Sequence, residues 1–132
     1  MNRMLLLINP KAGKEEIRAK GIDVIDLFTK HGWEVTVRTT QRQGEIPEIL
    51  RERAAEFPLV VCCGGDGTLN ETVDGLLSCP DAPALGYLPA GTVNDFASSL
   101  GIPKDLDEAA KMIVNGERFD CDVGTLNGRA FT

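Results

Sequence analysis

The sequence predicts an α/β domain: a three-layer sandwich with a mainly parallel, twisted sheet between two layers of helices. Short, uninterrupted apolar runs alternate along the chain with longer segments whose apolar residues recur at helical spacing. Glycine turns follow several of the apolar runs. The length of 132 residues and the 42% share of hydrophobic residues fit one main domain with a core of its own.

The first half of the chain predicts two strands and two helices. Residues 3–8 (RMLLLI) are apolar without alternation, as expected of a strand buried on both faces. A helix follows over residues 14–30 and stops at Gly32. Residues 33–38 are rich in β-branched side chains and predict a second strand, and the apolar spacing over residues 46–57 predicts a second helix.

The second half repeats a unit of strand, glycine turn and helix. The first copy covers residues 59–77 with its turn at residues 64–67, and the second covers residues 84–100 with its turn at residues 89–91. A further helix is expected over residues 107–115. Right-handed crossovers between parallel strands place every strand-to-helix loop at the same sheet edge, where open sheets of this kind bind ligands.

Charge and composition exclude several classes of protein. The net charge of −6 argues against nucleic-acid binding, which needs clustered Lys and Arg. No apolar stretch approaches the roughly 20 residues that span a bilayer, and none forms a signal peptide, so we expect a cytoplasmic protein. The cysteines lack metal-type spacing and are expected to be free structural thiols: Cys62, Cys63, Cys79 and Cys121.

The turn Gly64-Gly65-Asp66-Gly67-Thr68 has the composition of a phosphate site. Its glycines allow close approach of a ligand, and the turn opens into a helix whose first N–H groups attract anions. Asp66 is placed to carry Mg²⁺ or water to the phosphates, although it could equally hydrogen-bond the turn. A weaker metal candidate is Asp122, which with Asp120 flanks Cys121 in a strand expected over residues 118–126.

Thr68 and Glu71 also fit a capping box, in which Thr68 would cap the helix and Glu71 would bond the N–H of the cap. The same pattern recurs from Thr92 to Asp95. Two helix N-termini at one edge suit a polyphosphate. The loop from Asn9 to Lys14 adds two lysines there, or is simply a solvated loop.

Three ordered motifs resemble the bacterial diacylglycerol kinase and sphingosine kinase family: residues 9–13 (NPKAG), 64–71 (GGDGTLNE) and 89–97 (PAGTVNDFA). The resemblance implies an N-terminal domain like that of NAD kinase and phosphofructokinase. It also implies nucleotide-binding residues at Asn9, Pro10, Lys11, Gly13, Thr40, Gly64, Gly65, Asp66, Gly67, Thr68, Asn70, Glu71, Gly91, Thr92 and Asn94.

The resemblance further implies transfer of the ATP γ-phosphoryl group, with Mg²⁺, to a lipid hydroxyl such as that of diacylglycerol. Residues 1–120 would be the nucleotide-binding domain, and residues 121–132, with a hairpin at residues 127–128, the start of a truncated β-rich domain. That second domain would supply the catalytic base and the lipid groove, so this chain alone is expected to be inactive. The full enzyme would touch the membrane only transiently, and pairing of two copies through a sheet edge stays open.

Two alternatives remain at this point. An NAD kinase-like small-molecule kinase also uses a Gly-Gly-Asp-Gly turn, but it does not account for the motifs at residues 9–13 and 91–95. A non-catalytic nucleotide-binding regulatory domain would need neither a base nor a lipid groove.

Overall fold

The computed structural model describes residues 2–11, 14–79, 82–90 and 106–115. The elements in chain order are β1 (Asn2–Ile8), α1 (Lys14–Lys30), β2 (Trp33–Thr39), α2 (Glu45–Arg53), the 3-10 helix η1 (Ala54–Glu56), β3 (Leu59–Gly64), α3 (Asp66–Leu77), β4 (Ala84–Pro89) and α5 (Leu106–Val114). The helix expected over residues 93–100, the strand over residues 118–126 and the hairpin at residues 127–128 lie outside the described residues.

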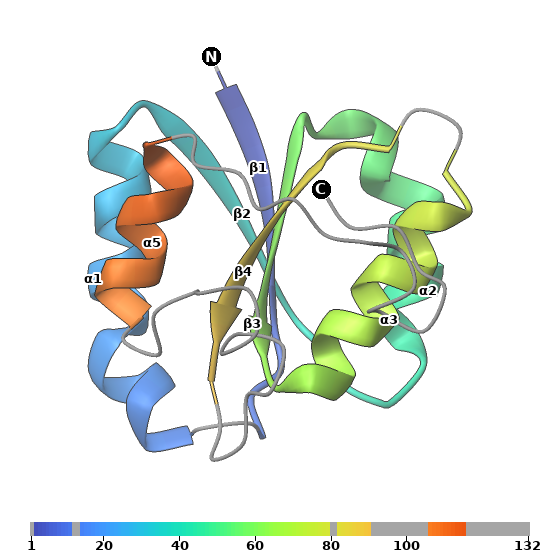
Figure 1. Ribbon diagram of the computed structural model, residues 1–132, viewed down its shortest axis with the longest axis horizontal. Coiled ribbons are helices and arrows are strands. Elements are labelled where there is room, and N and C mark those ends of the chain that lie inside the picture. The colour runs from blue at the N-terminus through green and yellow to red at the C-terminus, as the bar shows by residue number, and fades with distance from the viewer. Residues whose placement is uncertain (1, 12–13, 80–81, 91–105, 116–132) are drawn as a thin grey trace.

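Among the described residues, four strands form one parallel sheet in the order β2-β1-β3-β4. Helices α1 and α5 pack together on one face of this sheet, and α2 and α3 pack together on the other (Figure 1). The predicted three-layer α/β arrangement is therefore confirmed. None of the helices in the described part of the chain is long and apolar enough to cross a membrane.

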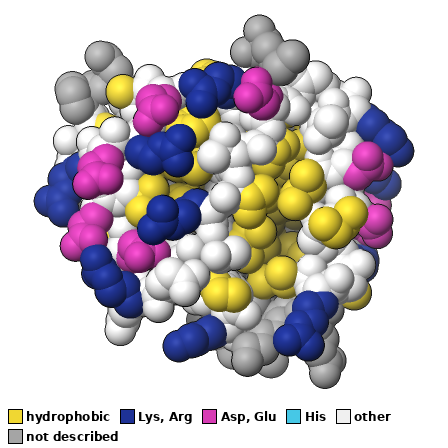
Figure 2. Space-filling model, turned by 180° about the vertical axis from the view of Figure 1, so that it is seen from behind, with side chains coloured by type: hydrophobic (Ala, Val, Ile, Leu, Met, Phe, Trp, Pro, Cys, Tyr) yellow, Lys and Arg dark blue, Asp and Glu magenta, His cyan; other side chains and the backbone are white. Residues whose placement is uncertain are grey.

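The two central strands account for the apolar runs without alternation. In β1 the residues from Met4 to Ile8 are all buried, and every residue of β3 is buried, because helices cover both faces of the sheet. Strand β2 lies at the sheet edge and is more open, with Val37 43% exposed. From behind, hydrophobic side chains gather along the middle of the molecule, with charged side chains on both sides (Figure 2).

The helix expected over residues 46–57 is shorter in the structure. Helix α2 ends at Arg53, one 3-10 turn follows, and Phe57 is already extended, with φ −126° and ψ 129°. The Phe57 ring is buried beneath the guanidinium groups of Arg3 and Arg53, at 4.9 and 5.4 Å from the ring centroid. Burial of Phe57 therefore comes from the turn into β3 and not from a continuing helix.

The described cysteines are free thiols, as expected. Cys62 and Cys63 are buried in β3 and Cys79 is half-buried after α3, while Cys121 lies outside the described residues. Burial raises the pKa of Cys62 from 9.0 to about 12, which keeps this thiol protonated and unreactive at neutral pH.

Helices α2 and α3 approach closely at Gly75. A Cβ built on Gly75 would lie 2.7 Å from Leu50 Cδ1 and 3.1 Å from the Cα of Pro47. The Leu50 methyl group could shift to relieve such a contact, but the Pro47 backbone could not move without displacing helix α2. Only a residue without a Cβ therefore fits at this crossing.

We expect Gly75→Ala to lower the free energy of unfolding by about 1–3 kcal/mol, because the added methyl group overpacks the α2–α3 contact. Gly21→Ala in α1 is the matched control, since its nearest neighbour, Ile17 Cγ2, is 3.9 Å away. That change should raise stability by about 0.5–1 kcal/mol through helix propensity. Urea unfolding of both variants measures the difference, and equal effects would contradict the packing argument.

Candidate functional site

A pocket of about 280 Å³ lies at the sheet edge where β1 and β3 end. The chain leaves β1 toward β2 on one side, whereas it leaves β3 toward β4 on the other. This reversal is the point at which parallel α/β sheets bind ligands. The lining comes from the loops after β1 and β2 and from helices α2 and α3: Asn9, Lys11, Thr40, Gln41, Arg42, Gln43, Ile46, Gly67, Thr68 and Glu71.

Backbone hydrogen bonds hold the strand ends together at this edge. The Asn9 N–H donates to the Cys63 carbonyl at 3.0 Å, and the Thr40 N–H donates to the Ile8 carbonyl at 2.8 Å. The Ala90 N–H donates to the Gly64 carbonyl at 2.9 Å. The predicted convergence of the loops is confirmed as far as the described residues reach.

Asn9 connects the first loop to helix α3. Its side-chain amide donates to Thr68 Oγ1 over 3.4 Å, and its Oδ1 accepts the N–H of Lys11 at 3.0 Å. These two bonds set the direction in which the loop leaves β1. Lys11 consequently joins the pocket lining, while the side chain of Lys14 lies outside the described residues.

The capping-box interpretation of Thr68 and Glu71 is wrong. Helix α3 begins at Asp66, its N-cap is Gly65 in an extended conformation, and no side chain caps it. Thr68 already lies within the first turn, where its hydroxyl accepts from Asn9. Glu71 faces another loop: its Oε1 accepts the N–H of Gly44 at 2.9 Å.

The close fit at Gly64 explains why α3 can start immediately after β3. A Cβ on Gly64 would lie 2.5 Å from Thr68 Oγ1 and 2.8 Å from Thr68 Cβ. Gly67 differs, because a Cβ there would meet none of the described atoms around it within 4 Å. Gly67 is exposed and lines the pocket, so its open side is available to a ligand.

Two carboxylates fix the loop between β2 and α2. Glu45, which is 8% exposed, accepts the N–H of Gln41 at 2.9 Å and lies 3.7 Å from the guanidinium of Arg38. Glu71 holds the other end of the loop at Gly44, whose φ of 84° is favoured by glycine. The sequence identified only Thr40 in this loop and missed Gln41, Arg42 and Gln43. The signal in the sequence that could have identified these three residues is their position just after the predicted end of a strand.

Tyr87 supports the glycine turn through a hydrogen bond from the neighbouring strand β4, and it was not identified from the sequence. Its buried hydroxyl donates to the Gly64 carbonyl at 3.0 Å. Burial raises the pKa of Tyr87 well above its ordinary value, so the hydroxyl remains a donor at physiological pH.

The structure divides the predicted nucleotide-binding residues into three groups. Those that line the pocket are Asn9, Lys11, Thr40, Gly67, Thr68 and Glu71. Those that lie nearby but do not line it are Pro10, Gly64, Gly65, Asp66 and Asn70. Those outside the described residues are Gly13, Gly91, Thr92 and Asn94, together with the metal candidates Asp120 and Asp122.

The described residues fit Mg²⁺ only as a partner of bound phosphates. No group of three or more His, Cys, Asp and Glu side chains gathers in this part of the chain. Asp66, the first residue of α3, lies directly beside the pocket residue Gly67. One carboxylate together with phosphate oxygens and water is a common ligand set for Mg²⁺.

Fold and pocket together define an α/β domain with a polar ligand site at the point where its sheet reverses. Residues 3–126 match the family described as the diacylglycerol kinase catalytic domain. The chain belongs to this family.

Relatives and solved structures agree with that assignment. The chain is 38% identical over 133 residues to a diacylglycerol kinase of Bacillus subtilis, and 37% identical over 130 residues to one of Staphylococcus epidermidis. These alignments cover 99% and 98% of this chain but 44% and 41% of the two relatives. The crystal structure of a diacylglycerol kinase from Bacillus anthracis matches with a TM-score of 0.80 and 32% identity, over 88% of this chain and 40% of that one.

Loss of the Glu71 carboxylate should loosen the loop between β2 and α2. We expect Glu71→Ala to speed amide hydrogen exchange at Gly44 about tenfold, because a charge-assisted bond of about 1.5 kcal/mol is lost. Glu71→Gln retains an acceptor oxygen and should have a smaller effect. Glu52→Ala on the exposed side of α2 is the control. Unchanged exchange in Glu71→Ala, measured by NMR, would show that the bond does not hold the loop.

Proposed function

We propose that this chain is the ATP-binding part of a lipid kinase that transfers the γ-phosphoryl group to a lipid hydroxyl such as that of diacylglycerol. The observation that carries the proposal is Gly67, which lies in the first turn of α3 and opens onto the pocket. A bound phosphate could approach this backbone closely, whereas any side chain there would occupy the same space.

The start of α3 supplies the donors that phosphate needs. The first bond closing the helix runs from the Leu69 N–H to the Gly65 carbonyl at 3.2 Å. The N–H groups of Gly67 and Thr68 come before it and have no acceptor within the helix. With the helix dipole, they form an anion site beside the cationic side chains of Lys11 and Arg42.

Positioning and charge neutralisation account for most of the catalysis of phosphoryl transfer. In our proposal Gly67 and Thr68 hold phosphate, Lys11 offsets its charge, and Asn9 and Thr40 orient the nucleotide. Asp66 would hold Mg²⁺, which when bound neutralises phosphate charge. The general base is expected outside the residues that line this pocket.

The family assignment supports a lipid acceptor over an NAD kinase-like activity, because the relatives are named diacylglycerol kinases. The chain spans less than half of the length of these relatives. Activity, acceptor and membrane contact therefore remain part of the proposal, and nucleotide binding is the part that this chain can test directly.

The sharpest test of phosphate binding is Gly67→Ala. The added methyl group meets no described neighbour within 4 Å, so the variant should fold with unchanged or slightly higher stability. It should nevertheless weaken Mg·ATP binding by about tenfold or more, because the methyl group takes the space of a phosphate and about 1.5 kcal/mol or more of charge-assisted bonding is lost. Titration calorimetry on this chain measures the affinity.

Gly21→Ala is the matched control, because it makes the same chemical change in α1 away from the pocket. Equal ATP affinity in wild type, Gly67→Ala and Gly21→Ala would show that no phosphate binds at this turn. A folded wild-type chain that binds no ATP would overturn the nucleotide site itself.

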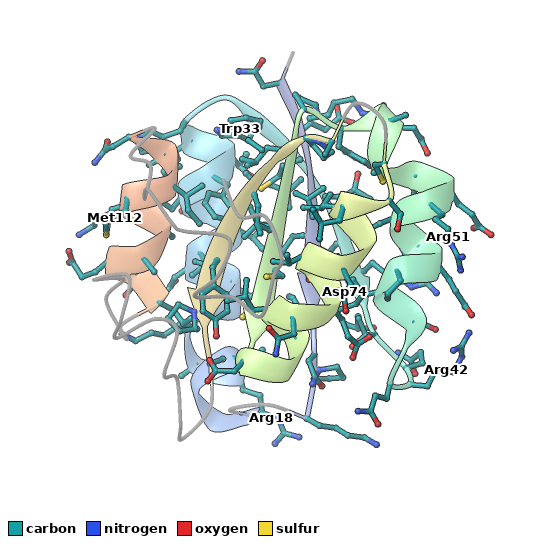
Figure 3. The ribbon with its side chains drawn as sticks, turned by 45° about the vertical axis from the view of Figure 1, so that its right-hand side comes forward. Arg18, Trp33, Arg42, Arg51, Asp74 and Met112 are labelled. Atoms are coloured by element: carbon teal, nitrogen blue, oxygen red, sulfur yellow. The ribbon has the colours of Figure 1, made fainter. Side chains whose placement is uncertain are left out.

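The role of Asp66 is tested by its dependence on metal. We expect Asp66→Asn to weaken ATP binding about tenfold in Mg²⁺ and to leave it nearly unchanged in EDTA, because only the metal-bound form needs the carboxylate. Asp74→Asn, farther along α3 and outside the pocket lining, should affect neither condition (Figure 3). If both conditions weakened equally, Asp66 would support the turn and not the metal.

A further inference from the structure

We infer that Arg42 is a phosphate-binding residue of the nucleotide pocket and that Glu48 competes with the phosphate for its guanidinium group. The inference rests on the proposed nucleotide site and adds a residue to it. It starts from the charges around the pocket. Lys11 and Arg42 are the cations among the described lining residues, and Glu71 is the carboxylate.

A triphosphate brings several negative charges into this lining. Glu71 adds another, although its Oε1 is bonded to the Gly44 N–H. Lys11 alone leaves most of that charge without a nearby cation. An arginine offers two parallel N–H donors to phosphate oxygens, which makes Arg42 the stronger of the two lining cations for this ligand.

The position of Arg42 is fixed although its side chain is exposed. Its neighbour Gln41 donates its N–H to the buried carboxylate of Glu45 at 2.9 Å, and Gly44 donates to Glu71 at 2.9 Å. The backbone on both sides of Arg42 is thus anchored. The side chain must move, but the loop that carries it need not be ordered when ligand binds.

In the structure the Arg42 guanidinium donates to Oε2 of Glu48 in the first half of α2. Both side chains are about half exposed, at 57% and 49%, and Glu48 does not line the pocket. Figure 3 shows Arg42 on the outer side, beside the start of α2. The Arg42 guanidinium, the second positive charge of the lining, is therefore paired with a carboxylate that lies outside the pocket.

An exposed ion pair is weak enough for phosphate to displace it. Removing the Glu48 charge should free Arg42 and tighten ATP binding. Removing Arg42 should weaken binding, and it should also abolish any benefit of the Glu48 change. This opposite sign within one ion pair distinguishes competition from a structural role, in which both changes would act in the same direction.

The experiment is a double-mutant cycle on this chain, with Mg·ATP affinity measured by calorimetry. We expect Glu48→Gln to tighten binding about two- to fivefold, as an exposed ion pair predicts. Arg42→Gln should weaken it about tenfold, as loss of a charge-assisted bond predicts. The double variant should equal Arg42→Gln alone. Glu48→Gln that binds no tighter, or a double variant that retains the gain, would overturn the competition.

Two matched controls carry the same charge changes away from the pocket. Glu56→Gln removes the partner of Arg53, which lies 3.3 Å away, and Arg51→Gln removes an exposed cation on the same helix. Both should leave ATP affinity unchanged. Titration with adenosine identifies the contacted group, since Arg42→Gln should not alter adenosine binding. An equal loss for adenosine and ATP would place Arg42 on the base or sugar and overturn the phosphate contact.

The cycle also separates this inference from the proposed function. If wild type binds ATP and Gly67→Ala weakens it while Arg42→Gln does not, the nucleotide site stands and the role of Arg42 fails. If wild type binds no ATP, both fail together.

Discussion

The parallel pairing of β1 with β3 is the constraint on which the rest of the structure depends. Residues Met4–Ile8 lie beside Leu59–Cys63, and helices cover both faces of this pair. Because the chain leaves the two strands in opposite directions, a pocket lined by described residues lies at the edge where the strands end side by side. The loop of Asn9 and the glycine turn after β3 therefore border one pocket, joined by the bond from the Asn9 N–H to Cys63.

Side chains that hydrogen-bond the backbone or a neighbouring helix hold the loops around this pocket. Glu45 and Glu71 accept N–H groups at the two ends of the loop after β2, and Asn9 bridges the first loop to α3. Interactions of this kind reduce the ordering that binding would otherwise require. Lys11 and Arg42 line the pocket, so positive charge is concentrated there although the net charge of the chain is −6.

Glycine serves three different purposes within a short stretch of this chain. At Gly64 the constraint is the side chain of Thr68, four residues later; at Gly75 it is the neighbouring helix α2. At Gly67 the described protein atoms impose no such limit, and the space belongs to the pocket. The first two glycines are explained by packing, whereas the third is explained in our proposal by a bound phosphate.

The sequence by itself determined the alternation of strands and helices, the burial of β1 and β3, and the edge where the glycine turn lies. These follow from local period and from the right-handed crossover rule, which act within one or two elements. The family resemblance also identified six of the residues that line the pocket, five of them within its motifs. Only the tertiary structure decided what Glu71 holds, because a capping box and a contact with Gly44, 27 residues away, look alike in sequence. The same is true of Tyr87, whose partner Gly64 lies in the neighbouring strand β3, 23 residues away, and is reached only once the two strands pair.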